Sequence, residues 1–183
     1  MRIGILTFHR ALNYGAILQC YALQKIIKEL GHEVEVIDYR PDYIEKDRDI
    51  IGRYSLRHAK GGVAKIKVMV TLFLSYIYRR RAKRVFDHFI SKHYVLSSKS
   101  FTGVSDIPQD YDVYLLGSDQ IWNPIICNGY SPVFWGQFKR KSISVLATYA
   151  ASLGLATVST KEKELLSTNL KSFDFISVRE DSL

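Results

Sequence analysis

The chain has 183 residues, enough for one hydrophobic core of ordinary size. Its 47% apolar and 24% charged residues exclude an intrinsically disordered chain. Lys and Arg number 26 against 18 Asp and Glu, and the resulting formal charge of +8 favours anionic partners such as phosphorylated metabolites, acidic glycans or lipid headgroups. We therefore expect one soluble domain over residues 1–183.

The cysteines and the apolar segments bear on metal binding and location. Cys20 and Cys127 stand outside any CxxC or His-rich spacing, so we expect no metal site and a reducing cytoplasm. The first ten residues (MRIGILTFHR) lack the apolar core of a signal peptide. The most apolar run, residues 68–78, is well below the ~20 residues that a membrane-spanning helix needs. We expect a cytoplasmic protein, with the inner face of the membrane as a further location.

The first forty residues have the pattern of a βαβ unit. Residues 2–7 predict a strand, and apolar residues recur at helical spacing through residues 17–30. Gly31 follows as a C-cap, and residues 33–38 alternate like a second strand. In such a unit the loop after the first strand lies at the carboxyl edge of the sheet, where ligands of α/β proteins bind.

The rest of the chain continues the α/β pattern. Residues 62–93 predict a helix, with a bend or break at the basic stretch RRRAKR, residues 79–84. Residues 94–111 have the composition of a loop, and a short helix begins with Ser159 or Thr160 as its N-cap. Three further strands are predicted at residues 112–117, 142–151 and 173–178. The sequence thus predicts a Rossmann-like α/β fold with a doubly wound parallel sheet.

Hydrogen-bonding groups crowd the end of the third predicted strand, in DVYLLGSDQIWNP at residues 112–124. Five of its residues are candidates for substrate binding: Gly117, Ser118, Gln120, Trp122 and Asn123. Asp119 is a candidate general base toward a hydroxyl, and the Trp122 ring can stack on a sugar. A structural interpretation stays open beside this one, because Ser118 or Asp119 can cap a turn and Trp122 can fill the core.

A second candidate segment is Asn13, Tyr14 and Gly15, at the start of the first helix, where backbone N–H groups can face an anion. The loop has neither GxGxxG nor GxxxxGKS, so no nucleotide fingerprint is present. An Asn cap followed by a glycine in a tight turn explains two of the three residues without a ligand. His9 is a weaker candidate, because a lone histidine in a loop is more often solvated than catalytic.

Basic residues supply the remaining candidates. Arg179, after the last predicted strand, can hold a carboxylate or phosphate, or can pair with Glu180. The basic residues 79–84, beside the apolar residues 68–78, are a candidate for peripheral contact with a membrane, with a solvated helix face as the simpler interpretation. Neither an aromatic platform nor a recognition helix accompanies them, so we expect no nucleic-acid partner.

Four segments, LTFHRALNYGAILQCYALQ, YDVYLLGSDQIWNP, YAASLG and FISVRE, together resemble the polysaccharide pyruvyl transferase family in order and separation. The resemblance covers nearly the whole chain. It implies a two-lobed fold similar to the GT-B glycosyltransferases, and transfer of pyruvate from phosphoenolpyruvate to a pair of sugar hydroxyls as a ketal. Phosphoenolpyruvate is then the donor substrate, and no cofactor is implied.

Members of this family are usually longer, and the Arg and His that the resemblance would assign to phosphoenolpyruvate lie in a second lobe. We therefore expect residues 1–183 to correspond to the N-terminal, acceptor-side lobe, with the C-terminal lobe absent and activity of the isolated chain left open. The expected partners are a sugar or lipid-linked glycan and a second copy in a homodimer. The alternatives are a GT-B glycosyltransferase lobe that uses a nucleotide sugar, and a non-catalytic interaction module.

Overall fold

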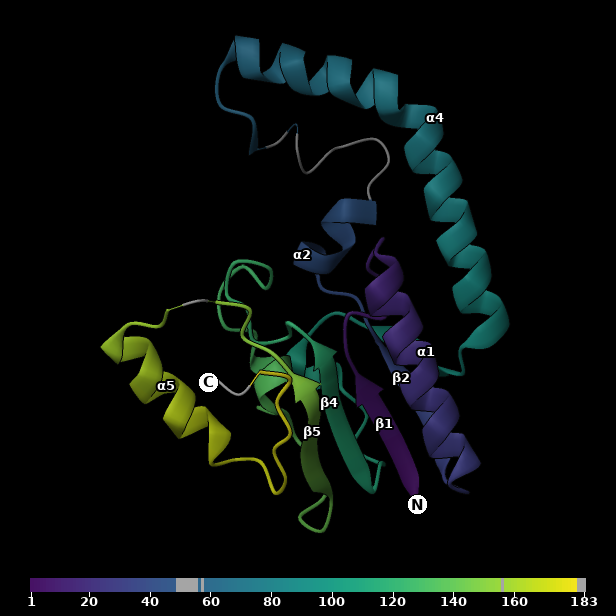
Figure 1. The fold of residues 1–183 in the computed structure, drawn as a ribbon, viewed down its shortest axis with the longest axis vertical. Coiled ribbons are helices and arrows are strands. Elements are labelled where there is room, and N and C mark those ends of the chain that lie inside the picture. Colours follow the sequence, from purple (N-terminus) through teal and green to yellow (C-terminus); the bar gives the residue numbers. More distant parts are fainter. Residues whose placement is uncertain (49–55, 57, 156, 181–183) are drawn as a thin grey trace.

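A five-stranded, all-parallel sheet forms the centre of the protein, as seen in a computed structural model that describes residues 1–48, 56, 58–155 and 157–180 (Figure 1). The strand order is β3-β2-β1-β4-β5. The strands are β1 (Arg2–Leu6), β2 (Glu33–Tyr39), β3 (Leu96–Phe101), β4 (Val113–Asp119) and β5 (Val145–Ala151). This sheet and its flanking helices confirm the predicted Rossmann-like α/β fold.

The helices begin and end where local sequence signals place them. They are α1 (Tyr14–Glu29), α2 (Asp42–Glu45), α4 (Gly62–His93) and α5 (Thr160–Leu170), with 3₁₀ turns η1 (Lys46–Arg48), η2 (Val104–Asp106) and η3 (Pro132–Trp135). The Asn13 side chain accepts a hydrogen bond from the Ala16 N–H at 3.2 Å, and Gly31 follows the helix at a φ of 83°. Ser159 and Glu162 form a capping box at α5. The predicted caps of both helices are confirmed.

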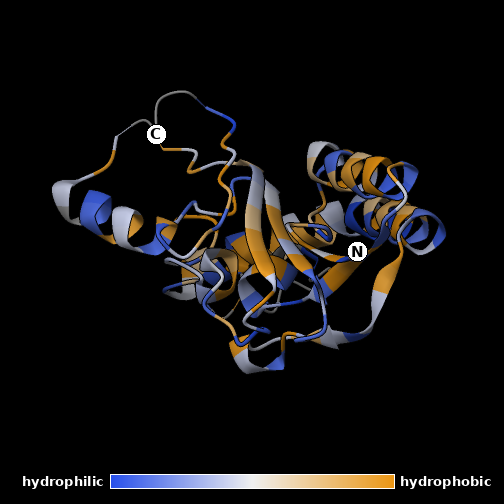
Figure 2. Ribbon diagram, turned by 90° about the horizontal axis from the view of Figure 1, so that it is seen from below, coloured by the Kyte–Doolittle hydropathy of each residue, from blue (hydrophilic) through white to orange (hydrophobic). Residues whose placement is uncertain are grey.

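The two faces of the sheet are covered by different kinds of structure. On one face Ile3 and Ile5 of β1 pack with α1 and with Phe86 and Ile90 near the end of α4. The other face carries an aromatic-rich core supplied largely by the connection between β4 and β5, at residues 120–144, which contains η3 in place of a long helix. Figure 2 shows the hydrophobic strands between these two layers.

Residues 96–101, predicted as part of a loop, form the edge strand β3, which pairs in parallel with β2. The sequence LSSKSF contains three serines and a lysine, and none of its residues is buried. An edge strand pairs on one side only and tolerates polar side chains. The prediction of a loop was wrong because the apolar signal that it relied on is weak at a sheet edge.

The prediction of a strand at residues 173–178 was also wrong. This segment runs beside β5 but is joined to it by two isolated parallel bridges, Ala147 to Phe175 and Ala151 to Val178. The sequence offset between partners changes by one residue between the bridges, and the Thr148 hydroxyl accepts a hydrogen bond from the Ser177 N–H at 2.9 Å in place of a backbone acceptor. The shift in register therefore interrupts the ladder.

Helix α4 runs without a break through residues 79–84, and Figure 1 shows that it is bent. Its first part lies away from the sheet, whereas its last turns pack on it. Among the described residues, no helix combines the length and the apolar character needed to cross a bilayer.

Candidate functional site

The order of the strands places a topological switch point between β1 and β4. These strands are neighbours, but the chain leaves β1 toward β2 on one side and leaves β4 toward β5 on the other. The loops that follow the two carboxyl ends therefore diverge, and ligands of open α/β sheets bind at such a switch point. The predicted residues 13–15 and 117–123 belong to these two loops and to the ends of the elements beside them.

Hydrogen bonds tie the two segments together at this rim. The Ser118 hydroxyl donates to Gln19 Oε1 at 2.8 Å, and Gln19 Nε2 donates to the Ser118 carbonyl oxygen at 3.2 Å. The Thr7 hydroxyl donates to the same carbonyl at 2.6 Å. The start of α1 and the end of β4 thus lie side by side, as the sequence predicted.

At the start of α1, the three predicted residues have different surroundings. Asn13 is the N-cap described above, so its side-chain oxygen is engaged by the helix. Tyr14 is 68% exposed and its ring lies against Phe86 of α4, with centroids 4.9 Å apart. A Cβ added to Gly15 would lie 3.1 Å from Asn13 Oδ1. The capping interpretation therefore accounts for Asn13, and the contact of Tyr14 with α4 was not predicted.

Gly117 and Asp119 have unusual backbone conformations where β4 ends. Gly117 has a φ of 106°, and an added Cβ would lie 2.5 Å from the carbonyl oxygen of Tyr149 on β5. Asp119 has a φ of 115°, which is uncommon for a residue other than glycine. Backbone outliers of this kind cluster at functional sites, because the surrounding structure must hold them in place.

Asp119 and Arg179 place opposite charges at the open edge of this rim. Asp119 Oδ1 accepts a hydrogen bond from the Gln120 N–H at 2.7 Å and lies 4.0 Å from Arg179 Nη2. The Arg179 side chain is 44% exposed, and its Nε also lies 3.4 Å from Glu180 Oε1. Glu180 accepts a hydrogen bond from the Ser152 hydroxyl at 2.6 Å. A partly exposed carboxylate and guanidinium can here bind a hydroxyl and an anion side by side.

The structure gives Trp122 and Asn123 contacts inside the protein. Trp122 is 2% exposed, stacks on Trp135 with centroids 4.8 Å apart, and donates from Nε1 to the Phe134 carbonyl oxygen at 3.0 Å. Asn123 is 5% exposed and donates to Gln120 Oε1 at 3.1 Å. The core interpretation of Trp122 therefore describes its surroundings, and substrate contact by these residues stays a prediction.

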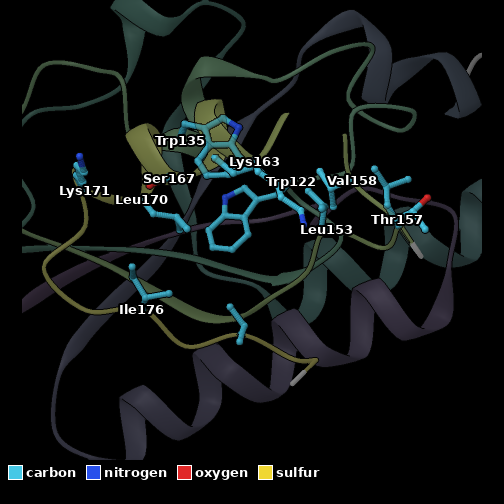
Figure 3. Close-up of a pocket in the computed structure, with 13 residues that line it drawn as sticks. Trp122, Trp135, Leu153, Thr157, Val158, Lys163, Ser167, Leu170, Lys171 and Ile176 are labelled. Carbon is cyan, nitrogen blue, oxygen red and sulfur yellow. The ribbon is translucent and has the colours of Figure 1, made fainter. Parts of the chain in front are cut away.

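A cavity of about 960 Å³ lies against the Trp122–Trp135 stack (Figure 3). Most of its lining is apolar and comes from Leu153, from α5 and from Ile176 and Val178, and Lys163 and Lys171 add positive charge. Trp135 Nε1 is buried and has no hydrogen-bond acceptor among the described residues. No cluster of metal-ligating side chains occurs in the part of the chain that the structure describes.

Comparison with known families assigns the chain to a family. A family model described as polysaccharide pyruvyl transferase matches residues 13–182. The chain belongs to the polysaccharide pyruvyl transferase family. The match starts at the N-cap of α1 and includes residues 117–123. Neither a curated protein nor a solved structure matches the chain.

The sequence did not predict one feature of this pyruvyl transferase family member: a cluster of the buried His9 and Asp38 with the partly exposed Arg40. His9 is 1% exposed, contrary to the expectation of a solvated loop histidine, and its Nε2 lies 3.0 Å from Asp38 Oδ1. Arg40 donates to both oxygens of Asp38, at 2.8 and 2.5 Å. Burial raises the pKa of Asp38, but the hydrogen bonds from His9 and Arg40 outweigh burial and hold this pKa well below its usual range.

A signal for this cluster was present in the sequence. Asp38 lies near the carboxyl end of β2, and His9 follows the end of the neighbouring strand β1. Since parallel strands end at the same edge, the two residues were candidates for contact. The cluster fixes the loop after β1, which leads into the rim.

Proposed function

We propose that this chain forms the acceptor-side lobe of a polysaccharide pyruvyl transferase that transfers pyruvate from phosphoenolpyruvate to two hydroxyls of a sugar as a ketal, in surface polysaccharide synthesis. The family match supports the reaction class. The observation that carries the site is the partly exposed pair of Asp119 and Arg179 beside the switch point between β1 and β4.

The reaction needs a base and positive charge at one place. One sugar hydroxyl adds to the carbon that bears the phosphate ester while the methylene carbon is protonated to a methyl group. Phosphate then leaves, and the second hydroxyl closes the ketal and loses its proton. Each hydroxyl must pass a proton to a base, and the carboxylate and phosphate of the donor must face cations.

The rim supplies groups of both kinds. In this proposal Asp119 accepts the proton of an acceptor hydroxyl, and the exposed Arg179 faces the anionic groups of the donor. Ser118, Gln120 and the first turn of α1 hold the remaining sugar hydroxyls. The hydrogen bond from the Gln120 N–H supports this assignment, since it restrains the Asp119 carboxylate at the end of β4.

The site is tested by NMR titration of the isotope-labelled chain with candidate acceptor sugars and with phosphoenolpyruvate. We expect the acceptor to shift the backbone signals of residues 13–15 and 117–123, and Asp119→Asn to weaken that binding. Glu164→Gln, on the exposed face of α5, is the matched control and should bind as the wild type does.

Two outcomes would count against the proposal. If neither ligand moves the signals of the two segments, the site assignment loses its basis. If calorimetry shows that a nucleotide sugar binds whereas phosphoenolpyruvate and the acceptors do not, the glycosyltransferase alternative is favoured.

A further inference from the structure

We propose that the first part of α4 binds the surface of an anionic membrane. We call residues 62–84 the α4 arm. None of them is buried, and the buried residues of the helix, Phe86 and Ile90, follow the arm. Figure 1 shows the beginning of the helix standing away from the sheet.

One face of the α4 arm is turned toward the rest of the molecule. Its half-buried residues recur mostly every three or four positions: Ala64, Val68, Leu72, Ser75, Arg79, Ala82 and Lys83. The spacing continues into Phe86 and Ile90, which pack in the core. This face is therefore the one that extends the buried side of the helix.

The opposite face is apolar and exposed. It carries a stripe whose exposed fractions are 71% for Val63, 58% for Ile66, 53% for Val70, 82% for Phe73, 77% for Leu74 and 80% for Ile77. The spacing of these residues places them on one side of the helix, away from the half-buried face. A contiguous apolar surface of this kind marks a binding surface.

Positive charge continues the same stripe. After Ile77, the next positions on the exposed face are occupied by Arg80, Arg81 and Arg84. The arm also carries Lys65, Lys67, Arg79 and Lys83, and no Asp or Glu occurs from Gly62 to Phe86. Lys83 pairs with Asp87, just beyond the arm, at 2.9 Å, so the positive charge of the exposed face comes from Arg80, Arg81 and Arg84. The arm is thus an amphipathic, basic helix.

This combination favours an anionic bilayer surface over other partners. Apolar side chains can enter the boundary between headgroups and acyl chains while Arg and Lys stay with the phosphates. Two arms packed together would bring their positive charges close to each other, and this repulsion disfavours a second copy as the partner. A nucleic acid would satisfy the arginines but would leave the apolar stripe in water. Membrane binding by the α4 arm does not depend on the proposed reaction.

A tryptophan reporter tests the proposal directly. Phe73→Trp places an indole in the exposed stripe, and the two native tryptophans are 2% and 1% exposed, so their emission should stay constant. With vesicles of phosphatidylglycerol and phosphatidylcholine in equal amounts, we expect a blue shift of the new indole and co-sedimentation of the protein. With phosphatidylcholine alone, we expect neither.

Paired variants separate the apolar and the electrostatic contributions to membrane binding. Phe73→Ser with Ile77→Ser should abolish sedimentation with the anionic vesicles, whereas Ile143→Ser, at a residue that is 85% exposed outside the arm, should leave it unchanged. Arg80→Gln with Arg81→Gln should weaken binding roughly thirtyfold, since each cation at an anionic surface contributes roughly a fivefold to sixfold gain. Lys25→Gln with Lys28→Gln, on α1, removes the same charge and should change binding little.

Other results would overturn the proposal. Equal binding to neutral and anionic vesicles, or an unshifted reporter, excludes an electrostatic surface contact. A dimer in sedimentation velocity that Phe73→Ser with Ile77→Ser abolishes, without vesicle binding, assigns the stripe to a second copy. Tight binding of single-stranded RNA without vesicle binding assigns the arm to nucleic acid.

Discussion

Gln19 of α1 and Ser118 of β4 exchange two hydrogen bonds, of 2.8 and 3.2 Å, although 99 positions separate them in the chain. These bonds cross the switch point between the strands that lead into the two candidate loops. Gln19 Nε2 also lies 3.2 Å from the Thr7 hydroxyl, at the end of β1. One amide therefore fixes the start of a helix against the ends of two strands.

Replacement of this amide should loosen the rim. Gln19→Ala removes the acceptor of the part-buried Ser118 hydroxyl and leaves the Ser118 carbonyl with the Thr7 hydroxyl as its donor. We expect a loss of about 1–2 kcal/mol in the free energy of unfolding. The measurement is urea denaturation followed by circular dichroism. Gln137→Ala is the control, because the hydrogen bond from the Gln137 side-chain amide to Asn169 is exposed to solvent. Equal losses in the two variants would show that the rim contact adds nothing.

Features set by neighbours in the sequence were predicted well. Asn13 caps α1 and Ser159 caps α5 through bonds to residues three positions ahead, so the signal lies within one turn. The strands of the inner sheet were predicted for a similar reason, since β1 and β4 are apolar along most of their length. The edge strand β3, at residues 96–101, depends on pairing with β2, and its mostly polar sequence does not predict a strand.

The sequence predicted which segments lie at the rim, but it did not predict where their side chains point. The rule that parallel strands end at one edge placed residues 117–123 beside the start of α1. The sequence could not show that Trp122 stacks on Trp135, because that contact depends on how the connection after β4 folds back. It also missed the burial of His9, whose partner Asp38 comes from another strand.

Gly117 should be far less tolerant of substitution than Gly129. Their φ values, 106° and 105°, are nearly equal, so alanine meets a similar backbone cost of about 1–3 kcal/mol at both positions. An added Cβ at Gly117 would lie 2.5 Å from the Tyr149 carbonyl oxygen, whereas nothing lies within 4 Å at Gly129. We expect Gly117→Ala to lose about 2 kcal/mol more than Gly129→Ala, by analogy with overpacked cores.

Urea denaturation of the two glycine variants measures this difference. NMR of Gly117→Ala should in addition show displaced signals for residues 118–120, because β4 must move away from β5. A similar loss of stability in both variants would show that the approach of Tyr149 imposes no constraint on Gly117.

The buried pair of His9 and Asp38 should make stability depend on pH. Because the folded-state pKa of Asp38 lies below its value of about 3.9 in an unfolded chain, the contribution of its charge is present above that pH and lost as the pH falls. Asp38→Asn should cost about 3 kcal/mol at neutral pH, since it leaves His9 and Arg40 without their carboxylate. The difference from the wild type should shrink below about pH 4.

Urea denaturation at several pH values tests this dependence. Glu164→Gln, at an exposed carboxylate of α5, is the control and should differ little from the wild type at any pH. If the gap between Asp38→Asn and the wild type stays constant down to strongly acidic pH, the charge of Asp38 is not the source of the stabilisation.

The two thiols should report on the integrity of both cores. Cys20, at 0% exposure, belongs to the core against α1, and Cys127, at 3%, belongs to the aromatic core. Burial raises the pKa of each thiol to about 12. Because the thiolate is the reactive form, we expect neither to react readily with a thiol reagent in the folded protein at pH 8, and both to react in denaturant.

An exposed thiol provides the reference rate for this measurement. Ser91→Cys, on an exposed position of α4, should react rapidly in the folded state. Because the pKa of each native thiol is about 12, neither forms much thiolate in the folded state between pH 7 and pH 9. Labelling of the native thiols should therefore require opening of the structure at both pH values. Fast labelling of the wild type, at the rate of the added cysteine, would mean that one of the cores opens. The Cys20→Ser and Cys127→Ser variants would then identify which face of the sheet is the less stable.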